Sequence, residues 1–354
     1  MKPWGSLPGD DPDRDRARSE GELEAVAESA GIDLHPAPPG QQRSVDAPGH
    51  GHSHPHQHSA PGAPPLTGVV GGGAVGTALA IALSRAGWPV QAVASRDPER
   101  RERFRRLVDG ARAFAEPQAL IEEVELIILA VPDDAIAGLA ASVRLYGGQA
   151  LVHTSGALGA DVLTPAMAAG SQAGAFHPLV AFADTERAIA ALHGATVAIE
   201  GDDQLAGLLA DMADALGATA VRLAPGSKAA YHAAAVLAAG GFVALLDAIV
   251  ELGAVAGLDE AGALAIYTPL LEGTLGNARS LGVAAALTGP VTRGDLGTLR
   301  AHLEALRKHA PGVLDLYAAA ARREIELARG RGALATERAS EMVETIGEAL
   351  ARED

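Results

Sequence analysis

Apolar residues are unevenly distributed along the 354 residues of the chain, and their pattern changes twice. Residues 1–65 hold few large apolar side chains and are rich in Pro, Gly, Asp, Arg and His, a composition that cannot form a core. From 66 to 224 short apolar runs alternate with amphipathic segments, and from 225 to 354 the periodicity is helical. We therefore expect a disordered tail, an α/β domain and an all-α domain over these three ranges.

The apolar runs predict the strands of a doubly wound, mostly parallel sheet. Glu125 to Val131 reads ELIILAV, an almost uninterrupted apolar run typical of a strand buried on both faces of a parallel sheet. Other strands are expected from Leu66, at Pro89–Ala94, near Ala113, and at Ala150–His153, Gly174–Leu179, Thr196–Ile199 and Thr219–Leu223. Helices of the second domain are expected at Ser227–Leu252, Glu260–Leu281, Asp295–Lys308, Gly312–Ala328 and Ala335–Ala351.

A glycine motif joins the first strand to the first helix. The segment from Gly71 to Gly76 reads GGGAVG, which fits G-x-G-x-x-G between a strand and a helix. Gly71 permits the turn, Gly73 lets a pyrophosphate approach the backbone, and Gly76 allows close packing of helix and strand. The N–H groups of Ala74 and Val75, at the helix N-terminus, would hold phosphate charge. The motif predicts a dinucleotide-binding Rossmann domain; the alternative is a glycine-rich turn without a ligand.

The end of the second strand indicates which dinucleotide is bound. An acidic residue at this position takes the ribose 2′-hydroxyl of NAD, but here the strand ends in Ser95 and Arg96. A hydroxyl and a guanidinium suit a 2′-phosphate, so the sequence favours NADP over NAD. Two alternatives remain: Asp97 could reach a ribose, and Arg96 could be an ordinary surface charge.

Ligands of doubly wound sheets bind at the carboxyl ends of the strands. We therefore expect the residues that follow the central strands to line one cleft, with the cofactor against Val131, Pro132, Thr154 and Ser155. His153 and His177 end two further strands, and His177 is expected to bind substrate. Histidines at strand ends also serve as simple packing residues, which is the alternative for both.

Composition narrows the choice of partners. The formal net charge of −16 argues against nucleic acid and against an anionic membrane surface. The absence of cysteine excludes disulfides and thiolate chemistry. The N-terminus has no apolar signal core, and the apolar run Ala233–Leu246 is too short to span a bilayer, so we expect a soluble cytoplasmic protein. Alternating histidines between His50 and His58 are either a solvated linker or an adventitious metal-binding tract, and no catalytic metal site is predicted.

Lysine is rare in this arginine-rich chain, with only Lys2, Lys228 and Lys308. Lys228 lies near the start of the long helix, and His232 follows one turn later on the same face. A lysine can be tuned by burial to donate a proton, whereas arginine cannot release one. The pair is therefore a candidate for acid/base catalysis, and the alternative is a surface lysine beside a core histidine.

Three polar residues of the helical domain are candidate substrate ligands. Asn277 lies on an otherwise small and apolar helix, where it could bind substrate or join two helices. The segment TGPVTRGD places Thr292 and Arg293 on an irregular loop, and Arg293 could hold a substrate carboxylate. Asp295 is expected to cap the next helix.

Seven segments occur in the order of one known family: GVVGGGAVG, VASRDPER, ILAVPDDAI, LVHTSGALGADVL, GAFHPLVAF, SKAAYHAAAVLAAGG and LTGPVTRGD. Over about residues 66–330 the chain resembles Rossmann-like proteins with a C-terminal domain of unknown function 2520. They belong to the superfamily of 6-phosphogluconate, 3-hydroxyisobutyrate and prephenate dehydrogenases and ketopantoate reductase. The resemblance implies an NADP-dependent oxidoreductase that pairs through its helical domains into a homodimer. It also implies a substrate-polarising lysine at Lys228, although His232 stands where the superfamily often has Asn.

These observations lead to three hypotheses. The first is a reductase or dehydrogenase acting on a small 2-oxo or hydroxy acid, such as one resembling ketopantoate, with an imine or a prephenate-like ring as alternatives. The second is a non-catalytic dinucleotide-binding sensor or assembly protein, which would not need Lys228. The third is a metal-handling protein that uses the histidine tract.

Overall fold

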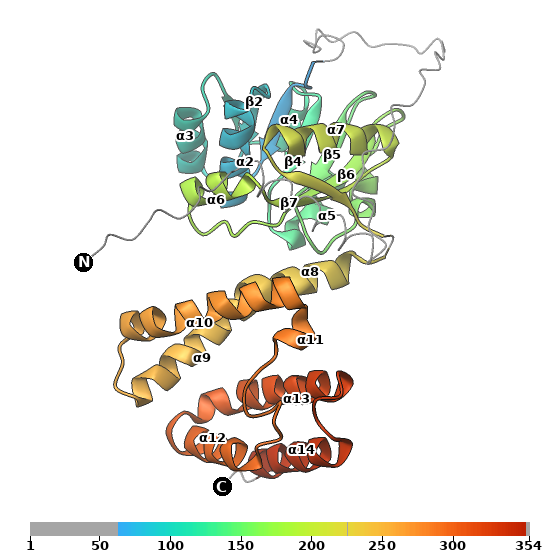
Figure 1. Cartoon of the computed structure of the whole chain (residues 1–354). Coiled ribbons are helices and arrows are strands. Elements are labelled where there is room, and N and C mark those ends of the chain that lie inside the picture. Colours follow the sequence, from blue (N-terminus) through green and yellow to red (C-terminus); the bar gives the residue numbers. More distant parts are fainter. Residues whose placement is uncertain (1–62, 225, 352–354) are drawn as a thin grey trace, which may run out of the picture. The chain divides into compact units, whose positions relative to one another are not determined.

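The computed structural model describes residues 63–224 and 226–351 (Figure 1). Residues 1–62, which include most of the expected tail and its whole histidine tract, therefore lie outside the described residues. The chain forms two compact units that divide between Ala235 and Val236. The first turns of the helix that follows the sheet thus belong to the sheet's own unit.

The first unit is built on one eight-stranded sheet, with the strand order β3-β2-β1-β4-β5-β6-β7-β8. All neighbouring strands pair in parallel except β6 and β7, which confirms the mostly parallel doubly wound sheet. The strands are β1 (Thr67–Val70), β2 (Val90–Ala94), β3 (Arg112–Phe114), β4 (Leu126–Leu129), β5 (Ala150–His153), β6 (Gln172–Pro178), β7 (Thr196–Glu200) and β8 (Thr219–Arg222). The strand order reverses between β1 and β4, the position where such sheets bind ligands.

Helices cover both faces of this sheet (Figure 1). One apolar core joins the sheet to α2 (Ala74–Arg85), α3 (Pro98–Leu107), α6 (Thr185–Leu192) and α7 (Asp203–Ala215). The other joins it to α4 (Pro117–Ile121), α5 (Asp133–Ser142) and the 3₁₀ segment η1 (Ala160–Ala166). Because both faces are covered, the central strands are apolar throughout: Leu126, Ile127, Ile128 and Leu129 of β4 are all buried.

The helix expected at Ser227–Leu252 contains an irregular segment. It consists of α8 (Lys228–Val236), a π-helical segment η2 (Leu237–Gly241) and α9 (Phe242–Val255). By length and composition alone, Lys228–Val255 is apolar enough to cross a membrane. The apolar run Ala233–Leu246 is thus part of a longer apolar helix that continues beyond Asp247. Core helices of soluble proteins can have the same length and composition.

The second unit is helical, as the periodicity predicts. Its helices are α9, α10 (Glu260–Leu281), α11 (Val283–Ala286), α12 (Leu296–His309), the 3₁₀ turn η3 (Pro311–Val313), α13 (Leu314–Gly330) and α14 (Thr336–Ala351). Buried residues of the last three α-helices form one core. Asp295 caps α12 by accepting the Thr298 N–H at 3.0 Å, which confirms its expected role.

Candidate functional site

The glycine motif forms the turn between β1 and α2, and two of its glycines are required by the protein itself. Gly71 has a φ of +113°, and a Cβ there would overlap the Ala130 carbonyl oxygen. A Cβ at Gly76 would overlap the Gly71 carbonyl oxygen and lie 3.0 Å from Val69 Cγ1. These two positions therefore allow the turn and the close packing of α2 on the sheet.

Gly73 differs because, among the described residues, only one atom lies within 4 Å of a Cβ built there. It is the N-cap residue of α2, and the nearest atom to a Cβ built there is Arg100 Nη1, at 3.9 Å. The first N–H groups of a helix have no partner within the helix, and Gly73 has no side chain to cap them. Ala74 and Val75 thus begin a helix whose N-terminus faces open space, which fits a pyrophosphate.

Arg100 is a cation at this turn that our sequence analysis missed. Its Cβ lies 3.2 Å from a Cβ built at Gly72, and its guanidinium Nε lies 3.3 Å from Asp97 Oδ2. Asp97 also accepts the Glu99 N–H at 2.9 Å, so it works as the N-cap of α3 rather than as a free ribose ligand. Arg96 is exposed and lies four residues before Arg100, outside α3. Nothing in the local sequence SRDPER distinguishes Arg100 from the other arginines of this segment.

The residues expected after the central strands lie around the same edge of the sheet. Val131 Cγ1 is 3.2 Å from a Cβ built at Gly71, and Pro132 is the N-cap residue of α5. Thr154 Oγ1 donates to the Leu129 carbonyl at 3.4 Å. Ser155 Oγ donates to Asp133 Oδ2 at 2.8 Å and accepts two backbone N–H groups, from residues 157 and 158. The Ser155 hydroxyl thus holds the loop after β5 in place.

Three neighbouring strands place polar side chains on one face of the sheet. His153 of β5 is in register with Ala175 of β6, which in turn is in register with Glu200 of β7. His177 lies two residues further along β6. Residues paired across a sheet share a face, and so do residues two apart, so His153, His177 and Glu200 all project from the same face.

Helix α8 adds three side chains to this cluster. Lys228 Nζ lies 3.2 Å from Glu200 Oε1, and the lysine side chain is only 9% exposed. The rings of His232 and Tyr231 lie 5.5 Å and 6.0 Å from the His177 ring, both edge-on. We define these six residues as the polar cluster: His153, His177, Glu200, Lys228, Tyr231 and His232.

Gly156 allows the loop after β5 to pass beside this cluster. A Cβ at this position would overlap His232 Nδ1 and would lie 2.6 Å from His177 Nε2. Any side chain there would displace both rings. Gly156 therefore sets the distance between the loop and the two histidines.

Both strand histidines are neutral at pH 7. His153 Nδ1 accepts the Ser155 N–H at 3.2 Å, so Nε2 carries the proton and donates to the Gly159 carbonyl, also at 3.2 Å. Burial, with the Lys228 charge, lowers the pKa of His153 to about 4. Burial also lowers the pKa of His177 to about 4, with smaller effects from His232 and Lys228. Burial raises the pKa of Tyr231 to about 12, so its hydroxyl keeps its proton.

Four polar atoms of the cluster are buried without a hydrogen-bond partner in the described part of the chain: His177 Nδ1, Lys228 Nζ, Tyr231 Oη and His232 Nδ1. Lys228 Nζ is ion-paired with Glu200. Buried polar groups are normally satisfied, and the three atoms other than Lys228 Nζ belong to neighbouring rings. The arrangement fits a position where a ligand's polar atoms complete the hydrogen bonds. With Lys228 beside them, these groups can bind and protonate an oxygen or nitrogen atom.

Comparison with known protein families identifies both parts of the chain. Residues 55–178 match the model of a Rossmann-like domain, and residues 195–324 match the domain of unknown function DUF2520. The chain is a Rossmann-like protein with a DUF2520 domain. Glu200, Lys228 and His232 lie inside the DUF2520 match. A search of curated proteins finds no match.

Solved structures show the same fold along most of this DUF2520 protein. A "putative NADP oxidoreductase" of Bacteroides fragilis is 22% identical, with 74% of this chain and 98% of that chain covered and a TM-score of 0.61. A protein of Thermotoga maritima is 27% identical, with 75% and 99% covered and a TM-score of 0.57. An imine reductase of Aspergillus terreus is 20% identical, with 80% and 99% covered and a TM-score of 0.54.

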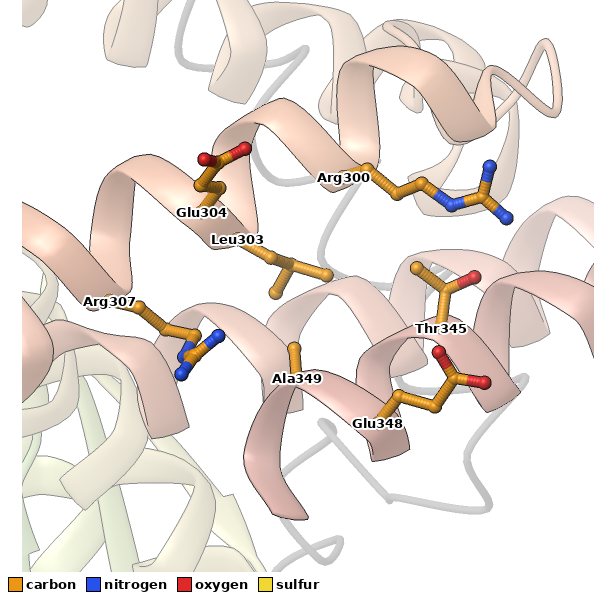
Figure 2. A pocket seen from close by; sticks show the side chains of 7 residues that line it. All are labelled: Arg300, Leu303, Glu304, Arg307, Thr345, Glu348 and Ala349. Atoms are coloured by element: carbon orange, nitrogen blue, oxygen red, sulfur yellow. The ribbon is translucent and has the colours of Figure 1, made fainter. Parts of the chain in front are cut away.

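The remaining candidate ligands lie in the second unit. Asn277 is an exposed residue of α10, and Arg293 is exposed in the loop before α12. Thr292 Oγ1 is buried without a partner in the described residues. The same unit has a surface groove between α12 and α14 that carries charges of both signs (Figure 2); it is lined by Arg300, Leu303, Glu304, Arg307, Thr345, Glu348 and Ala349. Within residues 63–224 and 226–351, no group of three or more His, Asp or Glu residues is arranged to hold a metal.

The buried His153 makes the stability of this DUF2520 protein depend on pH. Its folded-state pKa of about 4 lies below the ordinary value of 6.5, so between these two pH values the unfolded chain binds a proton that the folded chain does not. The free energy of unfolding should therefore fall as pH drops from 6.5 to 4, by on the order of 3 kcal/mol from this residue. Urea unfolding at pH 7 and pH 4.5 measures the effect. His153→Gln, which cannot titrate, should show a smaller difference between the two pH values; an undiminished difference would contradict this assignment.

Proposed function

We propose that this protein is an NADP-dependent oxidoreductase that transfers a hydride between NADP(H) and a small substrate bound at the polar cluster. The observation that carries the proposal is the buried Lys228 ammonium, whose Nζ is one of four polar atoms of the cluster without a hydrogen-bond partner among the described residues. The glycine turn with its open helix N-terminus supports the cofactor assignment. Two structures of the same fold also support it, because one is named an NADP oxidoreductase and the other is an imine reductase in complex with a form of NADPH.

The turn and the arginines beside it would hold the cofactor. Gly73, Ala74 and Val75 would present the helix N-terminus to the pyrophosphate, and Ser95, Arg96 and Arg100 would bind the 2′-phosphate; Ser95 and Arg100 both lie beside Gly72 of the turn. When bound, the nicotinamide supplies or accepts the hydride. Lys228 would donate a proton to the substrate oxygen or nitrogen as the hydride arrives, with His232 as its partner. Tyr231 and His177 would orient the same substrate atom by hydrogen bonds.

The substrate class that we propose is a small 2-oxo or hydroxy acid, similar to ketopantoate. The substrate ligands expected in the second unit, Asn277, Thr292 and Arg293, stay predictions from the sequence. An imine is the alternative, since a proton on nitrogen serves the same hydride transfer and the Aspergillus neighbour is named an imine reductase. The choice between them requires measured turnover.

Loss of NADPH absorbance with a panel of 2-oxo acids and cyclic imines tests the function directly. Turnover with one member of the panel supports the oxidoreductase and identifies the substrate class. Binding of NADPH without turnover of any member would favour a non-catalytic dinucleotide-binding sensor. Failure to bind NADPH would overturn the cofactor assignment as well.

The cofactor preference depends on the two arginines at the end of β2 and in α3. Replacing both Arg96 and Arg100 by Ala should raise the Kd for NADPH at least tenfold and leave the Kd for NADH within about threefold, because only NADPH carries the 2′-phosphate. Fluorescence titration with each nucleotide measures both constants. Arg103→Ala, at an exposed site on the same helix, is the matched control. Equal losses for the two nucleotides would show that these arginines do not read the 2′-phosphate.

We further propose that the protein is a cytoplasmic homodimer paired through the second unit. Large apolar residues are exposed on α9 and α10, among them Val243 and Leu270. Gly273 and Gly276 of α10 have no atom within 4 Å of an added Cβ, although glycine inside a helix is destabilising. Small residues beside exposed apolar ones suit close approach of a second helix. Light scattering should give twice the chain mass of 35.8 kDa, and Leu270→Arg should reduce it to one chain.

A further inference from the structure

We infer that Glu200 is the positioning residue of Lys228: its carboxylate holds the lysine side chain at the polar cluster and keeps the amine protonated. The inference rests on the proposed function, in which Lys228 is the proton donor. Glu200 would act through Lys228 and would not touch the substrate. It lies 28 residues before the lysine in the sequence, and the ion pair between them forms only when β7 and α8 come together.

The two oxygens of Glu200 have different partners. Oε1 lies 3.2 Å from Lys228 Nζ, and Oε2 accepts the Ala160 N–H at 2.9 Å. The carboxylate is thus held by the first residue of η1 while its other oxygen faces the ammonium. A carboxylate with a partner at each of its two oxygens restricts where the lysine side chain can lie. A freely rotating surface carboxylate would not do so.

Lys228 is surrounded by several titratable groups, and Glu200 is the one that contacts it. The charges of Asp133 in α5 and Asp161 in η1 also favour the protonated amine, with smaller effects on its pKa than Glu200. Asp133 in addition accepts the hydrogen bond of the Ser155 hydroxyl. The neighbouring histidines are His153 and His177, which are neutral, and His232 on the same helix. Among the described residues, the ion pair with Glu200 is therefore the direct compensation for the buried positive charge.

Burial of an amine favours its uncharged form, and a carboxylate in contact with it favours the charged form. Desolvation lowers the pKa of Lys228, and Glu200 is the largest opposing influence. A lysine that has lost its proton cannot protonate a substrate. Glu200 therefore extends the pH range in which Lys228 can act as an acid.

The test measures the Lys228 amine itself and needs no activity. The chain has only three lysines, so labelling with ε-¹³C lysine gives three NMR signals whose shifts follow titration. In Glu200→Gln, which keeps an acceptor for the Ala160 N–H, the acid dissociation constant of Lys228 should increase at least tenfold. The signals of Lys2 and Lys308 should be unchanged and serve as internal controls.

Two matched variants make the result specific. Asp203→Asn removes a carboxylate that pairs with Arg222 on an exposed surface, and it should leave the Lys228 titration unchanged. Glu200→Asp retains the charge on a shorter side chain, and it should restore most of the titration midpoint, which also keeps the test valid if Glu200→Gln folds poorly. An unchanged Lys228 titration in Glu200→Gln would overturn the inference. So would a Glu200→Asp variant whose Lys228 titration midpoint is as low as that of Glu200→Gln.

Activity then gives a second and separate readout. In Glu200→Gln the alkaline limb of the kcat profile should move to lower pH by the same amount as the NMR midpoint, with the Kd for NADPH unchanged. A shifted NMR midpoint without any change in the kcat profile would refute the proton-donor role of Lys228 while leaving the Glu200–Lys228 pairing intact. The two claims can therefore fail independently.

Discussion

Lys228→Met is expected to reduce kcat by about 100- to 10,000-fold, the usual contribution of a positioned proton donor, and to leave NADPH binding nearly unchanged. Methionine retains much of the apolar length of the lysine stem but has no proton to give. The Glu200 side chain that loses its partner is 27% exposed, so water can solvate the carboxylate and the fold should persist. The glycine turn does not contact Lys228, so the cofactor should still bind.

Steady-state turnover and NADPH fluorescence titration on the same preparations measure this separation. Lys308→Met, at an exposed position in α12, is the matched control and should behave as the wild type. Turnover that survives Lys228→Met would exclude the lysine as the acid. A simultaneous loss of NADPH binding would mean that the lysine supports the cofactor site rather than the chemistry.

The second large effect is expected from two single variants of the glycine turn, Gly73→Ala and Gly76→Ala, which should change NADPH binding and stability respectively. Gly73→Ala should leave the melting temperature within a few degrees of the wild type, because the nearest atom to the new methyl is 3.9 Å away. It should raise the Kd for NADPH at least tenfold, because the methyl occupies the side from which a pyrophosphate would approach. Gly76→Ala should instead destabilise the fold by about 3 kcal/mol or more, because its methyl overlaps the backbone of Gly71.

Thermal unfolding measures the stability of both variants, and fluorescence titration measures their Kd for NADPH. The prediction requires that the two effects separate: binding is lost without instability at Gly73, and stability is lost at Gly76. If Gly73→Ala binds NADPH as the wild type does, the open side of the turn is not the phosphate site.

Much of the fold could be predicted because its signals are local. The apolar run of β4, the glycine turn and the periodicity of α10 each depend on residues close together in sequence, and all three are present. The placement of Lys228 and His232 was also accessible, since four-residue spacing puts both on one helix face. The structure adds that this face turns toward His177.

Features that depend on distant contacts could not be predicted. The segment TVAIEGDD reads as an ordinary strand followed by a turn, and only the pairing of β7 with β6 brings Glu200 to the row of His153. Arg100 looked like one of several surface arginines until α3 packed beside the glycine turn. The π segment within the long helix likewise leaves no mark in its apolar periodicity.

Gly156 has a consequence for anyone who would redesign the substrate range. Because a side chain at this position would strike His177 and His232 together, a library randomised there should contain mainly inactive clones. The Tyr231 ring lies 6.0 Å from the His177 ring, and its buried hydroxyl has no hydrogen-bond partner among the described residues that a substitution would remove. Directed evolution should therefore find new specificities at Tyr231, with Gly156 kept constant.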